Sequence, residues 1–188
     1  EGVKVGENEL RIGVGSGWAV SKIGWNKDIP SFFPEPALIA TLLISYKDGT
    51  EEQIVSDTSW KTADSPILFD MRRCGEKFDA RLKINGWFDP DFDDSAWDNA
   101  FICKGLGGKF RKKIVEPIRI MRLIRGTEIA KGLFDFGTNT SGWARINVKG
   151  KSGNEIVIKY SENLTDDKNQ VDQSSITNGG THKDQYIM

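Results

Sequence analysis

Acidic and aromatic side chains are the residues of this chain that could act on a ligand. The chain has 27 Asp and Glu residues and six Trp residues among 188. Two carboxyl groups that face one substrate can act as general acid and general base. With so many acids some pair always looks suitable, and Glu76 and Asp79 are the two candidates. No pattern separates them from structural acids, so the residues alone predict no catalytic pair.

Two further residues could bind a polar ligand with an apolar face. Trp18 follows Gly15 and Gly17, which would let a ligand approach the backbone, and an indole face can stack on a sugar ring. Arg81 stands two residues after Asp79 and could bind hydroxyl groups in a bidentate manner. The alternatives are a core position for Trp18 and a structural ion pair for Arg81. Four further tryptophans are interpreted as core: Trp60, Trp87, Trp97 and Trp143.

The other chemistry-bearing residues favour structural roles. The single histidine, His182, lies in a polar segment, which is a poor place for a catalytic imidazole. The acids between Asp89 and Asp94 are spaced like the start of an EF-hand. However, Asp94 stands where that loop needs Gly, and Ala100 where it needs Glu, so turn and capping roles are favoured. Cys74 and Cys103 have no zinc-type spacing; two buried or half-buried free thiols are favoured, and a disulfide between them is the alternative.

Charge and hydropathy exclude two classes of partner. The net charge is −1, which gives no field to attract nucleic acid or acidic lipid. The one basic cluster, Lys109–Lys113, is short and is interpreted as a solvated connector. No stretch approaches the roughly 20 apolar residues that a membrane span needs. We therefore expect no nucleic acid partner and no membrane span.

The elements that must position these residues follow a period of two. Residues 38–46 and 52–57 read as strands around a Lys-Asp-Gly turn, and residues 144–148 and 156–160 read as a second hairpin. A strand is favoured over a helix for residues 70–82, and a short helical turn is expected at 93–97. Short strands between turn signals favour a sandwich or a barrel. We predict an all-β fold of antiparallel, jelly-roll-like β-sandwich modules with little helix. Further strands are expected at 9–14, 67–71, 78–84, 114–124, 133–136 and 184–188.

A series of motifs along nearly the whole chain resembles the N-terminal region of bacterial α-L-rhamnosidases of glycoside hydrolase family 78. The two most specific are the Gly-Glu-x-x-Asp-Ala-Arg segment at 75–81 and the Phe-Asp-Phe-Gly-x-Asn segment at 134–139, followed by Gly142 and Trp143. The remaining segments occur in the family's order and spacing. They are residues 6–10, 15–18, 45–50, 56–61, 86–87, 92–97, 160–162 and 181–188.

The resemblance implies two modules. Residues 1–103 would be the rhamnosidase N-terminal β-sandwich, related to a rhamnose-binding module, with its first strands missing. Residues 104–188 would begin a second β-sandwich that is truncated at its C-terminus. The family's catalytic (α/α)6 barrel lies further along the chain, so no catalytic residue can be assigned. The parent would be a glycosidase that degrades polysaccharides, and the fragment itself is expected to be inactive.

The role that the resemblance implies is recognition of a carbohydrate containing L-rhamnose, scaffolding of the parent's catalytic domain, or both. A lectin-like module, or a structural spacer without a ligand, is the alternative. Calcium stays open as a cofactor because related rhamnose-binding modules use it, although no ligands can be mapped. The resemblance favours a periplasmic or secreted location over a cytoplasmic one. The candidate carbohydrate-binding residues are Trp18, Glu76, Asp79 and Arg81.

Overall fold

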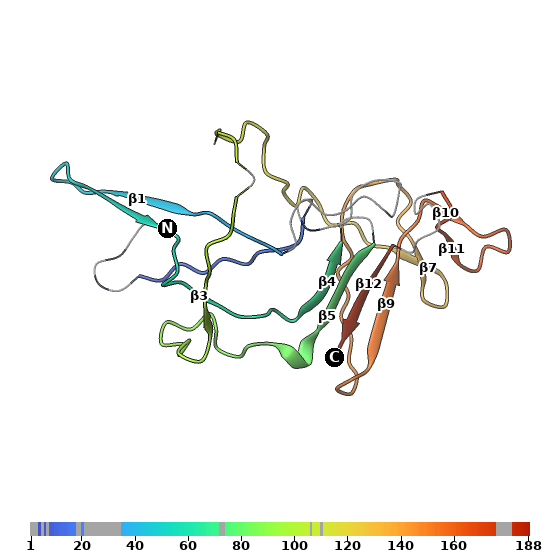
Figure 1. Cartoon of the computed structure of the whole chain (residues 1–188). Helices are drawn as coiled ribbons and strands as arrows, with labels where there is room; N and C mark the ends of the chain where they lie inside the picture. Colours follow the sequence, from blue (N-terminus) through green and yellow to red (C-terminus); the bar gives the residue numbers. More distant parts are fainter. Residues whose placement is uncertain are drawn as a thin grey trace.

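The structure is a computed structural model in which almost every regular element is a β-strand (Figure 1). It describes residues 4, 6, 8–17, 20, 35–71, 74–105, 107–109, 111–175 and 182–188. Within this part, one 3-10 turn is the single helical element, and no helix is long and apolar enough to cross a membrane. The all-β prediction is confirmed. The elements are β1 (Thr41–Ser45), β2 (Glu51–Val55), β3 (Lys61–Thr62), β4 (Ile67–Met71), β5 (Gly75–Asp79), η1 (Ala80–Leu82), β6 (Asp98–Asn99), β7 (Thr127–Ala130), β8 (Leu133–Asp135), β9 (Glu155–Lys159), β10 (Asn163–Leu164), β11 (Val171–Asp172) and β12 (Lys183–Ile187).

The centre of the fold is a four-stranded sheet in the order β4-β5-β12-β9. Its pairs are antiparallel except for β5 and β12, which run parallel and join the two halves of the chain. Gly75 makes this close approach possible. It has a φ of +92°, and a Cβ there would lie 2.0 Å from the carbonyl oxygen of Lys183. Only glycine fits such a position without strain.

The two faces of this sheet differ in character. Side chains alternate between the faces along each strand, so register decides which residues share a face. Phe78, Tyr186 and Ile156 are neighbours across β5, β12 and β9 on one face. On the opposite face, Lys77 and Gln185 occupy the equivalent positions. The aromatic face is therefore the one that can hold an apolar or stacking ligand.

The β1–β2 hairpin confirms the first predicted hairpin. Thr41 pairs with Val55 and Ser45 with Glu51. The turn is held by Asp48, whose side chain accepts a hydrogen bond from the amide of Thr50 at 3.0 Å. The hairpin extends away from the four-stranded sheet (Figure 1). Every residue of β2 is exposed, so this hairpin contributes little to a core.

The second predicted hairpin is wrong in one arm. Its turn forms, since the amide of Asn154 donates to the carbonyl of Lys151, and its second arm is β9. However, β9 pairs with β12 instead of with residues 144–148, which form no strand. A long-range partner has replaced the local one. The predicted strands at 9–14 and 114–124 are also absent from the described residues, and strand 78–84 ends at Asp79 where η1 begins. At 93–97 a turn forms but no helix, since the amide of Trp97 donates to the carbonyl of Asp94 at 2.9 Å.

The apolar core is small. Leu133 of β8, with 9% of its surface exposed, is the one buried hydrophobic residue of the described part. The accessible surface is 16494 Å², whereas a compact protein of 21.0 kDa exposes about 9,000 Å². The fold positions its side chains on sheets whose apolar surfaces stay open. Cys74 and Cys103 are free thiols.

Candidate functional site

A groove of about 1210 Å³ runs over the aromatic face of the four-stranded sheet. Its floor carries Phe78 and Tyr186, whose rings are stacked with centroids 5.4 Å apart and planes 3° from parallel. Ile156 and Tyr160 extend the floor, and residues 143–149 form a second wall. The register of β5, β12 and β9 thus gathers side chains that are far apart in the sequence.

A row of carboxylates crosses the sheet beside the stacked rings. Asp70 of β4 pairs with Glu76 of β5, and the amide of Glu76 donates to Asp184 Oδ1 at 3.0 Å. The hydroxyl of Tyr160 donates to Asp184 Oδ2 at 2.7 Å. At the far end, Asp70 accepts a hydrogen bond from the amide of Ser16 at 2.8 Å. The groove therefore offers hydrogen-bond acceptors next to an apolar platform.

Burial and mutual repulsion alter the titration of this row. The pKa of Glu76 is raised, first because partial burial disfavours its charge and then because Asp184 and Asp70 are nearby. The pKa of Tyr160 is also raised, first by burial and then by its hydrogen bond to Asp184. Both shifts favour the protonated, hydrogen-bond-donating form of the side chain.

Cations border the groove on two sides. The Lys83 Nζ atom lies 5.6 Å from the centre of the Phe78 ring, within the range of a cation–π contact. Arg145 lines the opposite wall. Stacked rings, carboxylate acceptors and cationic donors together suit a ligand that has hydroxyl groups around an apolar face.

Three of the four predicted binding residues are among the described residues, and of these three Glu76 alone lines the groove. Asp79 follows on the opposite face of β5, with 4% of its surface exposed. Its carboxylate accepts two hydrogen bonds from Arg81, from Nε at 2.9 Å and from Nη2 at 2.6 Å. The side chain of Asp79 also caps η1 by accepting from the amide of Arg81 at 3.0 Å. Trp18 lies outside the described residues.

The ion pair shifts both of its members. The hydrogen bonds donated by Arg81 hold the pKa of Asp79 below its ordinary value, and the same contact raises the pKa of Arg81. Each group already uses the other's bidentate edge. The pair therefore fixes the end of β5, with the carboxylate of Asp79 buried and the Arg81 side chain 52% exposed.

Sequence reasoning missed several residues of the groove. Trp143 was interpreted as core, yet 64% of its surface is exposed and it lines the groove. The contact between Asp184 and Tyr160 was not predicted, because it depends on the β9–β12 register. One sequence signal could have pointed to Trp143: it directly follows a glycine, Gly142, as Trp18 directly follows Gly17.

The remaining candidates have local partners. The ring of His182 lies 5.6 Å from that of Tyr160. The carboxylate of Asp93 accepts a hydrogen bond from the amide of Ser95 at 3.0 Å, which is a turn-capping role. Within the described ranges, no group of three His, Cys, Asp or Glu side chains is arranged to hold a metal ion.

The fold and the groove define an all-β module, and comparison with known proteins identifies the family. The family model of the α-L-rhamnosidase N-terminal domain matches residues 1–122, and that of the bacterial α-L-rhamnosidase concanavalin-like domain matches residues 125–188. The chain belongs to the α-L-rhamnosidase family and resembles the N-terminal region of its members.

Individual relatives agree with this assignment. An α-L-rhamnosidase of Streptomyces avermitilis is 34% identical over 175 residues, covering 88% of this chain and 16% of the relative. One from Formosa agariphila is 30% identical over an alignment of 194 residues, which covers 97% of this chain and 20% of the relative. The chain thus spans about a fifth of the length of the curated relatives that it matches.

Solved structures give the same result for the fold. The α-L-rhamnosidase from Dictyoglumus thermophilum has a TM-score of 0.71 at 37% identity, over 82% of this chain and 18% of that one. The Streptomyces avermitilis α-L-rhamnosidase complexed with L-rhamnose has a TM-score of 0.69 at 31% identity, over 92% and 17%.

Proposed function

We propose that this chain is a non-catalytic part of an α-L-rhamnosidase and that its main role is to scaffold the rest of the enzyme, including the catalytic domain. The supporting observation is its accessible surface of 16494 Å², against about 9,000 Å² for a compact protein of this mass. Large apolar side chains such as Phe101 and Ile102 account for part of this surface. Exposed apolar area of this extent marks a surface that another protein segment covers.

Deleting residues 1–188 from the full-length rhamnosidase tests this role. The shortened enzyme should melt at a lower temperature and lose glycoside hydrolysis on mild heating, because apolar surface on the remainder is uncovered. Adding the 188-residue chain in trans should restore part of the heat resistance. An unchanged melting temperature and hydrolysis rate after deletion would contradict the scaffolding role.

A second candidate role is recognition of a carbohydrate that contains L-rhamnose. It is favoured by the groove, which combines the exposed ring of Trp143 with Tyr160 and the carboxylates of Glu76 and Asp184. A related rhamnosidase has been solved with L-rhamnose bound. Among the described residues predicted from the sequence, Glu76 has the geometry that best fits this role because it lines the groove, whereas Asp79 and Arg81 do not.

Titration calorimetry with L-rhamnose, with and without calcium, tests this second role. Saturable heat should appear, and Trp143→Ala should abolish it because the stacking surface is lost. The control Phe88→Ala removes a ring outside the groove that is 73% exposed, against 64% for Trp143, and should bind as the wild type does. A flat trace in both conditions would remove carbohydrate recognition.

We also propose that residues 1–103 and 104–188 are two modules. Brief trypsin treatment should then cut first within residues 104–113, which hold five basic residues and whose described residues are exposed. The two products should stay associated under native conditions, because β5 and β12 pair across the cut. Products that separate without denaturant would count against this arrangement.

A further inference from the structure

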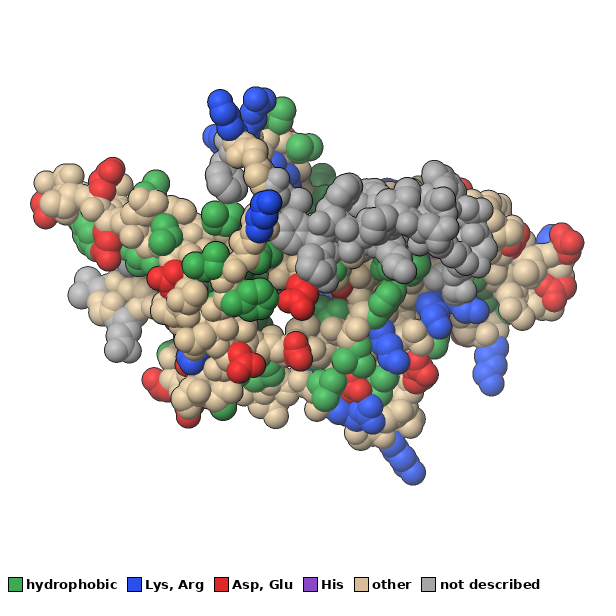
Figure 2. Space-filling model, viewed as in Figure 1, with side chains coloured by type: hydrophobic (Ala, Val, Ile, Leu, Met, Phe, Trp, Pro, Cys, Tyr) green, Lys and Arg blue, Asp and Glu red, His purple; other side chains and the backbone are tan. Residues whose placement is uncertain are grey.

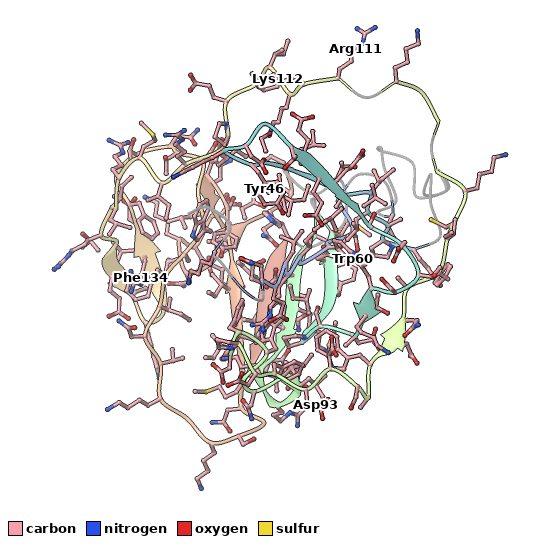
Figure 3. All side chains as sticks on the ribbon, turned by 90° about the vertical axis from the view of Figure 1, so that its left-hand side faces the viewer. Tyr46, Trp60, Asp93, Arg111, Lys112 and Phe134 are labelled. Atoms are coloured by element: carbon pink, nitrogen blue, oxygen red, sulfur yellow. The ribbon has the colours of Figure 1, made fainter. Side chains whose placement is uncertain are left out.

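Residues 111–125, the basic segment, combine high exposure with an apolar composition. The exposed fractions are 96% for Ile114, 92% for Ile118 and 87% for Met121. The backbone of the segment makes no hydrogen bond to any other described residue. Arg111 and Lys112 lie on an outlying stretch of the ribbon and point away from it, and Lys and Arg side chains gather on a projection of the surface (Figures 2 and 3).

The second half of this segment has the composition of a strand. After Pro117, the residues Ile118, Ile120, Leu123 and Ile124 favour β structure, with an arginine between or after them. Pro117 cannot donate a ladder hydrogen bond, so a strand would begin after it. Residues 118–125 therefore have β-strand propensity and unpaired backbone groups at the same place.

The charge of the segment restricts what could pair with it. Residues 111–125 hold six bases and one acid, Glu116, in a chain whose net charge is −1. The bases are Arg111, Lys112, Lys113, Arg119, Arg122 and Arg125. An unpaired strand is a template for another strand, and opposite charges across strands stabilise the pair. The matching partner is thus a sheet edge that carries acidic and apolar side chains.

We infer that residues 118–125 dock as an added strand on an acidic sheet edge in the remainder of an α-L-rhamnosidase chain. This inference rests on the proposed scaffolding role and names its contact. The chain spans 16–20% of the relatives' length, so a rhamnosidase supplies ample polypeptide for such an edge. Backbone pairing provides the attachment, and the arginines select the acidic partner.

A synthetic strand peptide of alternating Val and Glu probes the 188-residue chain. It should bind and slow hydrogen exchange at residues 118–125, whereas a Val and Lys peptide should not. Raising the ionic strength from about 0.01 M to about 0.15 M shortens the Debye length from about 30 Å to about 8 Å and should weaken binding. Equal binding of both peptides would overturn the inference, as would tighter binding to duplex DNA or to phosphatidylserine vesicles.

Two matched variants distinguish strand pairing from non-specific hydrophobic binding of the peptide. Ile120→Pro removes a ladder donor and should weaken Val-Glu peptide binding about tenfold or more. Ile102→Pro changes an isoleucine outside the segment that is even more exposed, at 82% against 67% for Ile120, and should bind as the wild type does. Identical weakening by both substitutions would overturn the inference. So would salt-sensitive dimerisation of the chain alone that Ile120→Pro abolishes, because the partner would then be a second copy.

Hydrogen exchange in the full-length rhamnosidase distinguishes a failure of the docking strand from a failure of the scaffolding role. Slow exchange at residues 118–125, with faster exchange in Ile120→Pro, supports the docking strand. Protection of other apolar stretches without protection of 118–125 overturns the docking strand and leaves the scaffolding role standing. No protection anywhere beyond that of the 188-residue chain removes both.

Discussion

The four-stranded sheet and residues 118–125 of the basic segment both contain β-forming residues, but only the strands of the sheet pair with other described residues. Strands β5, β12 and β9 find partners within the chain and build a groove. Residues 118–125 are richer in isoleucine, leucine and methionine than these strands, yet no described residue pairs with them. The difference shows that partner availability, more than local propensity, decides which segments of this chain become strands.

Gly75→Ala should have the largest effect, because it breaks the paired region at its crossing point. The new Cβ would meet the carbonyl oxygen of Lys183 at 2.0 Å and would force an alanine into a positive φ. We expect a loss of at least about 2 kcal/mol in the free energy of unfolding, measured by urea denaturation.

The matched control for this change is Gly105→Ala. Apart from its chain neighbours, no described atom lies within 4 Å of a Cβ at Gly105, and its φ is not positive. This variant should unfold at the wild-type urea concentration. Equal losses in both variants would mean that the β5–β12 crossing does not limit stability.

Leu133→Ala and Leu123→Ala sharpen the comparison between a packed and an unpacked residue. Leu133 is buried, so its truncation should cost about 2 kcal/mol or more, whereas Leu123 is 77% exposed and its truncation should change stability by less than about 0.5 kcal/mol. Thermal or urea unfolding measures both. A larger loss for Leu123 would show that residue 123 is packed in solution.

Asp79→Asn should affect the acid side of the stability curve. The pKa of Asp79 is lowered, first by the hydrogen bond that Arg81 donates. The contribution of Asp79 to the free energy of unfolding is therefore fully present above the ordinary aspartate pKa of about 4. It is lost as pH falls through the lower folded-state pKa. The variant should speed hydrogen exchange around η1 several-fold at neutral pH and remove this part of the acid dependence. Unchanged exchange at the amides of Arg81 and Lys83 would contradict the capping role.

Glu76→Gln should have the smallest effect and the opposite pH dependence. The pKa of Glu76 is raised, first by burial and then by Asp184 and Asp70. Folding favours the protonated form of Glu76. The contribution of Glu76 to the free energy of unfolding is therefore present below its ordinary pKa and is lost as pH rises through the folded-state pKa. The substitution should stabilise the chain by less than about 1 kcal/mol at neutral pH, since water screens the partly exposed groove, and should have no effect in acid. Unfolding midpoints at both pH values test it, and destabilisation at neutral pH would contradict it.

Local features of the fold could be predicted from the sequence, and long-range pairing could not. The β1–β2 hairpin followed from alternation around the turn at Asp48 and Gly49, and residues 184–188 were expected to begin a strand. The partner of β9 was missed because a nearby arm, residues 144–148, looked equally suitable. The register that brings Asp184 beside Glu76 spans 108 residues and leaves no local pattern.

The candidate site shows the same limit. Glu76 was found from its motif, but its neighbours Tyr160 and Trp143 became visible only once β9 and the 143–149 wall were placed. Asp79 and Arg81 were nominated as binding residues, with an ion pair as the alternative, and their spacing of two residues could not decide between these roles. The structure directs their polar groups at each other.

Side-chain footprinting with hydroxyl radicals tests the scaffolding account most directly. The 188-residue chain and the full-length rhamnosidase are labelled in parallel, and modification of Phe101, Met121 and Trp143 is measured by mass spectrometry. The account predicts strong labelling in the isolated chain and marked shielding in the full-length enzyme. Equal labelling of all three residues in both proteins would contradict it.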